Sequence, residues 1–115
     1  MNWYKKAQHI YEGFKVVGFN QGSNQFYSIY DKSPYDVSIG KEVRDPNGFY
    51  LGSTKQFCTD YYICMTEDDH DEYILTFSYG DEDLMRGEPN NPNTEVLVSR
   101  GTITGMERVD KEGLC

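Results

Sequence analysis

The chain has 115 residues, a size that predicts a single domain, residues 1–115, with a hydrophobic core of its own. Its formal net charge is −8, which argues against direct binding to nucleic acid, because phosphate contacts need an excess of Lys and Arg. The sequence contains no long apolar run and no signal peptide. We therefore expect no membrane span and a cytoplasmic location.

The cysteines point to the same compartment. Cys58, Cys64 and Cys115 are odd in number and dispersed, a pattern typical of proteins in reducing surroundings. Cys58 and Cys64 both fall in a predicted helix, six residues apart, so their side chains point in different directions. We expect no disulfide between these two.

The first predicted element is a helix over residues 1–12. Apolar side chains recur there at helical spacing, and Gly13 is a plausible C-terminal stop. We expect Trp3 and Ile10 to pack this helix onto a sheet. Extended segments should follow at residues 14–20, 26–30 and 37–43.

A second helix is predicted in the middle of the chain, after a turn at residues 45–48 and a short strand at residues 49–51. Ser53 can cap this helix, with Gln56 three residues later as a capping box requires. The helix carries two adjacent apolar stripes. One stripe contains Phe57, Tyr61 and Cys64, and the other contains Cys58, Tyr62 and Met65.

The second half of the chain predicts three further strands. Residues 73–79 alternate between apolar and polar side chains, as in a half-buried strand. A long polar loop at residues 80–93 leads to strands at 94–99 and 101–109, which a tight connection joins; whether they pair as a hairpin is open. The side chains expected in the core are Phe57, Tyr61, Leu75, Phe77, Val96 and Val98.

This order of elements predicts an α+β fold, with a mainly antiparallel sheet and an N-terminal helix and one central helix packed on it. Residues 66–72, TEDDHDE, place five acids around His70. Their spacing lacks the alternating ligands and the central Gly of a calcium loop. The chain also has no CxxC spacing and no Cys/His zinc pattern. We expect a solvated loop here and no bound metal.

Two short motifs in the second half of the chain resemble those of the ADP-ribosyltransferase fold, in a reduced form. Leu51-Gly52-Ser53-Thr54-Lys55 is similar to the Ser-Thr-Ser motif that opens onto a helix in that family. Asn93-Thr94-Glu95-Val96-Leu97-Val98, followed by Arg100-Gly101-Thr102, is similar to its Glu before a valine-rich strand. The resemblance covers about residues 14–109.

The resemblance implies NAD as a possible cofactor and transfer through a ribosyl cation. Glu95 would stabilise the developing positive charge, and Ser53 or Thr54 would brace Glu95 or the nicotinamide ribose. Lys15 lies near the place on the first strand where the family holds the NAD phosphates. Gly52 exposes backbone N–H groups at a helix N-terminus, and Tyr50 is expected to line the same cleft.

Three positions differ from the family pattern. Lys55 takes the place of the second Ser, Asn93 stands where many members carry Glu or Gln, and Lys15 replaces the first-strand Arg or His. These differences favour a non-catalytic interaction module with a protein partner, with a small NAD-dependent ADP-ribosyltransferase as the alternative. A hydrolase that uses Cys58 or Cys64 with His70 is a weaker third hypothesis, because buried thiols are inert.

A second resemblance rests on the Gly-Lys segment before the central strand. Asp36-Val37-Ser38-Ile39-Gly40-Lys41, followed by Gly48-Phe49 and a helix, looks like a pattern in small uncharacterised phage-type proteins. That group implies no activity for this chain.

Overall fold

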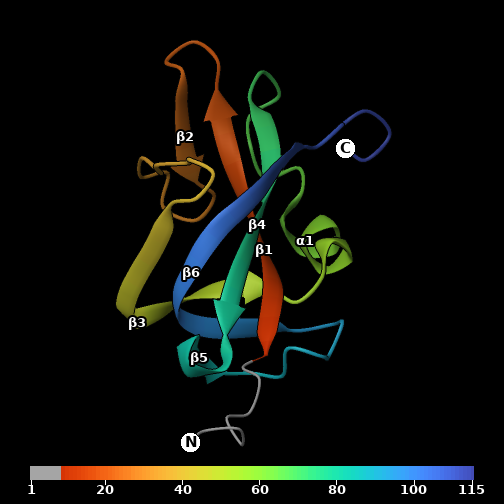
Figure 1. Cartoon of the computed structure of the whole chain (residues 1–115). Helices are drawn as coiled ribbons and strands as arrows, with labels where there is room; N and C mark the ends of the chain where they lie inside the picture. Colours follow the sequence, from red (N-terminus) through yellow and green to blue (C-terminus); the bar gives the residue numbers. More distant parts are fainter. Residues whose placement is uncertain (1–8) are drawn as a thin grey trace, which may run out of the picture.

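The structure is a computed structural model that describes residues 9–115. Within residues 9–115, six strands make one antiparallel sheet, and one α-helix packs beside it (Figure 1). The elements in chain order are β1 (Ile10–Asn20), β2 (Gln25–Ser28), β3 (Glu42–Gly52), α1 (Lys55–Tyr62), β4 (Asp71–Gly80), the 3-10 turn η1 (Asp81–Asp83), β5 (Leu84–Arg86) and β6 (Glu95–Arg108).

Four of the strands form a closed ring. β1 pairs with β4 along almost its whole length, β4 pairs with β6, β6 pairs with β3, and β3 returns to β1. This last contact is a single pair, Phe14 with Gly52. β2 extends the sheet from β1, and β5 extends it from β6. The ring therefore has one weak seam, between β1 and β3.

Two hydrophobic clusters follow from the alternation of side chains along the strands. Neighbouring residues of β1, Val16 and Val17, belong to different clusters, and so do Ile74 and Leu75 of β4. The larger cluster fills the ring. The smaller one lies against α1, whose buried side chain is Cys58. The core of the ring comprises Val17, Leu51, Leu75, Phe77, Tyr79, Val96, Val98 and Ile103.

The prediction of an N-terminal helix is wrong for its last residues, which the structure describes as strand. Residues 10–12 begin β1, because Tyr11 and Glu12 pair with Tyr79 and Ser78 of β4. Ile10 is 66% exposed rather than packed in the core. Residues 1–8, with Trp3, lie outside the described residues. For the part of the chain that the structure describes, the predicted fold class is corrected to a mainly antiparallel sheet with one α-helix.

The central helix forms, but its cap and its buried face differ from the prediction. Thr54, not Ser53, accepts the hydrogen bond from the backbone N–H of Phe57, at 3.0 Å. The helix buries Cys58 from the second stripe, which leaves Tyr61 of the first stripe 65% exposed. Tyr61 therefore does not belong to the core, whereas the four predicted strand residues Leu75, Phe77, Val96 and Val98 are fully buried.

Two predicted breaks turn out to lie inside long strands. β3 passes through the expected turn at residues 45–48 with a shift in register between Arg44 and Phe49. β6 continues through residues 99–101, because Arg100 and Gly101 pair with Arg44 and Val43 of β3. The missing side chain of Gly101 leaves space for the ring of Phe77, so this glycine serves close packing rather than a turn.

The connection between β4 and β6 is partly ordered rather than a plain loop, since it contains η1 and β5. Asp83 is buried there and accepts hydrogen bonds from the backbone N–H of Gly80, at 2.9 Å, and from Arg100 Nε, at 2.8 Å. Among residues 9–115, no helix has both the length and the apolar character that crossing a membrane would require.

Candidate functional site

The seam between β1 and β3 holds the main candidate site, which we call the seam cavity. Its lining includes four of the residues predicted from the sequence, Lys15, Tyr50, Gly52 and Glu95. Lys15 comes from β1, Tyr50 and Gly52 from β3, and Glu95 is the first residue of β6, directly paired with Gly52. The remaining wall consists of Phe14, Val16, Ile29, Tyr30 and Tyr62.

Glu95 is held by a chain of phenol groups. Tyr30 donates a hydrogen bond to the Tyr62 hydroxyl at 2.5 Å, and Tyr62 donates to Glu95 Oε2 at 2.8 Å. Burial, together with the hydrogen bonds to Tyr30 and Glu95, raises the pKa of Tyr62 above its usual value. Tyr62 therefore stays a neutral donor, and one oxygen of the Glu95 carboxylate is committed to it.

Ser53 and Thr54 fasten the loop before β6 to the start of α1. Ser53 is buried; its Oγ donates to the Asn91 carbonyl at 2.5 Å, and its N–H donates to the Thr94 carbonyl at 3.0 Å. Thr54 Oγ1 donates to the Pro92 carbonyl at 3.0 Å while it caps the helix. Ser53 and Thr54 directly follow Gly52, which lines the seam cavity, but neither of them is part of the lining.

Lys15 is a partly buried amine. Burial lowers the pKa of Lys15, and the nearby Cys58, Glu95 and Asp31 offset this only in part. Its Nζ lies 5.7 Å from the centre of the Tyr35 ring, within the range of a cation–π contact.

Tyr50 also lines the seam cavity and is 45% exposed. Its hydroxyl accepts a hydrogen bond from Arg86, whose guanidinium also lies over the ring.

The cysteines are not placed for nucleophilic chemistry. Burial raises the pKa of the Cys58 thiol to about 12, so it is protonated at neutral pH. Cys64 is bonded to Cys115 in a disulfide. The helical spacing argued only against a bond between Cys58 and Cys64, and it did not identify Cys115 as a partner. The geometry therefore gives no support to a hydrolase built on either thiol.

The seam cavity is small. Its volume is about 20 Å³, which is room for about one water molecule. Sites for small organic ligands are typically hundreds of Å³. With Tyr30 and Tyr62 in their present positions, the cavity does not admit a dinucleotide.

An aromatic track that was not predicted from the sequence begins at two residues of the cavity lining, Tyr30 and Tyr62. Ring centres follow one another from Tyr30 to Tyr62 at 5.7 Å, from Tyr62 to Phe57 at 6.2 Å, and from Phe57 to Tyr61 at 4.6 Å. Tyr30 and Tyr61, the two ends, are 64% and 65% exposed. The high tyrosine content of the sequence could have indicated this aromatic surface. It was missed because Tyr61 was assigned to the core.

Comparison with protein-family models, with curated proteins and with solved structures gives no match. The resemblances to ADP-ribosyltransferases and to phage-type proteins therefore remain hypotheses that rest on short motifs.

Proposed function

We propose that this protein is a non-catalytic interaction module that binds a partner protein. The observation that carries the proposal is that the predicted catalytic groups are engaged in hydrogen bonds within the protein. Glu95 accepts from Tyr62, Ser53 donates to Asn91, and Thr54 donates to Pro92. A transferase would need such groups directed at a substrate, in a cavity larger than about 20 Å³.

The aromatic track, Tyr30, Tyr62, Phe57 and Tyr61, is the proposed contact surface. Tyrosine is enriched at protein interfaces because its ring buries a large apolar area while its hydroxyl still finds a hydrogen-bond partner. The net charge of −8 favours a partner with a positively charged surface. Complementary charge would speed the encounter, and the tyrosines would supply the central contacts.

Site-specific photo-crosslinking tests this surface. A photoreactive amino acid at the exposed position 60, beside Tyr61, should capture a partner in an extract of the native cells, and unlabelled wild-type protein should compete for it. Tyr61→Ser should compete about tenfold less well, because a large aromatic side chain buried in an interface is often worth more than 1 kcal/mol. Added salt should weaken capture.

Ile39→Ser is the matched control, because Ile39 is 62% exposed and lies outside the track. It should compete as well as the wild type. Equal competition by Tyr61→Ser and the wild type would contradict the proposed surface.

An NAD-dependent ADP-ribosyltransferase is the second candidate, because Lys15, Tyr50, Gly52 and Glu95 all line one cavity. We expect NAD titrated by calorimetry to show no binding at millimolar concentration and no release of nicotinamide. Release that is lost in Glu95→Gln would establish the transferase instead. Binding without release would indicate a scaffold that keeps the cofactor but not the chemistry.

The cytoplasmic location predicted from the sequence is part of this proposal. The Cys64–Cys115 disulfide opposes it, because such bonds persist mainly in oxidising compartments. Alkylation of thiols in intact cells before lysis distinguishes the two. Modification of both cysteines would agree with the cytoplasm, and protection of both would place the protein elsewhere.

A further inference from the structure

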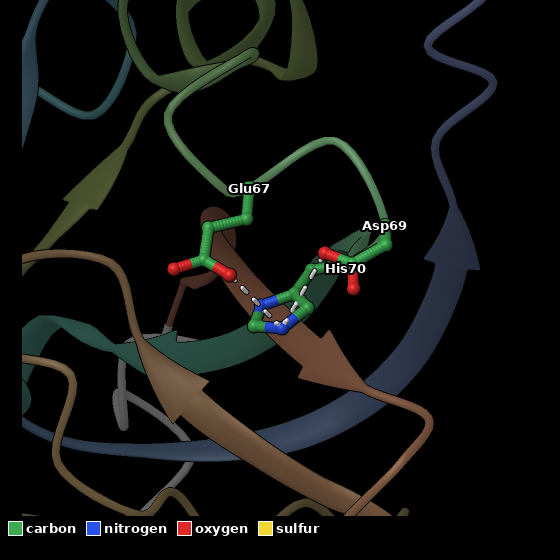
Figure 2. Close-up of side chains that lie close together, drawn as sticks. All are labelled: Glu67, Asp69 and His70. Carbon is green, nitrogen blue, oxygen red and sulfur yellow. Dashed lines mark ion pairs between the residues drawn. The ribbon is translucent and has the colours of Figure 1, made fainter.

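Three potential metal ligands converge in the loop between α1 and β4. This loop lies beside the C-terminal end of β1, because Phe19 pairs with Asp71, the first residue of β4. The ligand atoms of Glu67, Asp69 and His70 all lie within 4.8 Å of one another. His70 Nε2 is 3.6 Å from Glu67 Oε2 and 3.9 Å from Asp69 Oδ1. Figure 2 shows both carboxylates directed toward the imidazole ring.

The imidazole is fixed by a residue outside this group. The Tyr27 hydroxyl lies 2.7 Å from His70 Nδ1, and the His70 side chain is only 15% exposed. When the hydroxyl accepts from Nδ1–H, the lone pair of Nε2 points toward the carboxylates. Metal-binding histidines are commonly oriented by such a hydrogen bond on their second nitrogen.

The backbone of the loop is also held in place. Lys111 Nζ donates to the His70 carbonyl at 2.7 Å and to the Glu67 carbonyl at 3.2 Å. The His70 N–H donates to the Glu67 carbonyl at 3.0 Å, which closes the turn. These bonds hold the backbone that carries Glu67 and His70, while the Glu67 and Asp69 side chains remain largely exposed.

The separations of His70 from the two carboxylates suit a metal ion better than direct hydrogen bonds. Both His70–carboxylate distances exceed the length of a hydrogen bond. Two ligands that are each about 2.1 Å from an ion at a tetrahedral angle lie roughly 3.4 Å apart. A neighbouring cavity of about 320 Å³, with Tyr27, Glu67 and His70 in its wall, leaves space for an ion to enter and for water ligands.

We propose that Glu67, Asp69 and His70 form a binding site for a divalent transition-metal ion, with Zn²⁺ as the best match. Imidazole nitrogen with carboxylate oxygens is a zinc ligand set, and three protein ligands leave a fourth position for water. Calcium and magnesium prefer all-oxygen sites. No metal was expected from the sequence, because the spacing does not fit a calcium loop and the chain shows no Cys/His zinc pattern. A site made of one His and two carboxylates follows neither of these patterns.

Calorimetric titration of the metal-free, disulfide-bonded protein with Zn²⁺ tests the site. We expect one ion per chain, and an affinity reduced about tenfold or more in His70→Gln and in Glu67→Gln. Tyr27→Phe keeps all three ligands but removes the orienting hydroxyl, and it should weaken binding by about tenfold. Ca²⁺ should bind much more weakly than Zn²⁺. Circular dichroism of each variant verifies that it is folded.

Two matched controls separate this site from nonspecific binding. His9→Gln removes the other histidine of the chain, and Asp68→Asn removes an adjacent acid outside the group. Both should bind Zn²⁺ as the wild type does, and nitrogen NMR should show that Zn²⁺ shifts His70 Nε2 but not His9. The proposal is overturned if the wild type binds no Zn²⁺ at millimolar concentration, or if folded His70→Gln and Glu67→Gln bind it unchanged.

Discussion

At the scale of single residues, buried polar side chains hold segments of the backbone in place. Glu72 is fully buried, yet its carboxylate accepts from the backbone N–H groups of Cys64 and Met65, at 2.9 and 3.4 Å. The sequence placed Glu72 in a solvated acidic loop because its neighbours are charged. Composition describes a segment on average, whereas one carboxylate can turn inward when unpaired backbone groups need an acceptor.

The candidate site was partly predictable at this scale. A Gly-Ser turn beside a helix and a Glu at the start of a strand indicated that Gly52 and Glu95 come together, and they are paired residues. The roles of Ser53 and Thr54 were not predictable, because both can cap a helix. The neighbouring carbonyls of Asn91 and Pro92, 38 residues away in sequence, decide where each hydroxyl donates.

Lys15 gives a prediction about stability and pH. Its pKa is lowered by burial in the folded state, so the unfolded chain binds more protons than the folded protein just below the ordinary lysine pKa. Stability should therefore rise with pH as it approaches about 10.5 from below.

Lys15→Met should raise the free energy of unfolding at pH 7 by about 1 kcal/mol, because it removes a charge from a partly apolar site. It should also flatten this part of the pH profile in urea unfolding experiments. A loss of stability in Lys15→Met would mean that the amine contributes to folding.

At the scale of elements, strand existence was easier to predict than strand length. The alternating run at residues 73–79 correctly indicated β4, because half-buried strands carry a period of two. The turn-forming residues at 45–48 and the glycine at 101 suggested breaks in β3 and β6. Both strands continue because each has a partner that pairs across the irregularity, and pairing partners are not visible in a local window.

The irregularity in β3 gives a prediction with an internal control. Gly48 has φ +86, and a Cβ there would lie 2.8 Å from side-chain atoms of Leu97 and Met85. Gly40 has φ +90, but a Cβ there would meet no atom within 4 Å. Gly40→Ala should cost about 1 kcal/mol from backbone strain alone, and Gly48→Ala should cost more because it adds a steric clash. Equal losses in urea unfolding would mean that Leu97 and Met85 move aside freely.

At the scale of the whole molecule, closure of the ring could not be derived from the sequence. β1 and β4 pair in ten consecutive positions although about 60 residues separate them, and nothing local marks that pairing. The prediction of an N-terminal helix failed for the same reason. Residues 10–12 fit a helical pattern, but the exposed edge of β4 offers Tyr11 and Glu12 a ladder of backbone hydrogen bonds.

The disulfide is the one covalent link across this fold, and it gives the last prediction. Cys64 and Cys115 are 51 residues apart, and a loop of that length is expected to stabilise the folded state by about 4 kcal/mol through the entropy of the unfolded chain. Reduction should therefore lower the unfolding midpoint of the wild type, and Cys115→Ser should have the same effect without reductant. Adding reductant to Cys115→Ser should change nothing further, because Cys64 has then lost its disulfide partner and Cys58 is a buried free thiol. If reduction leaves the wild-type midpoint unchanged, the C-terminal segment is held by its other contacts, including the hydrogen bonds of Lys111 to the loop at residues 66–70.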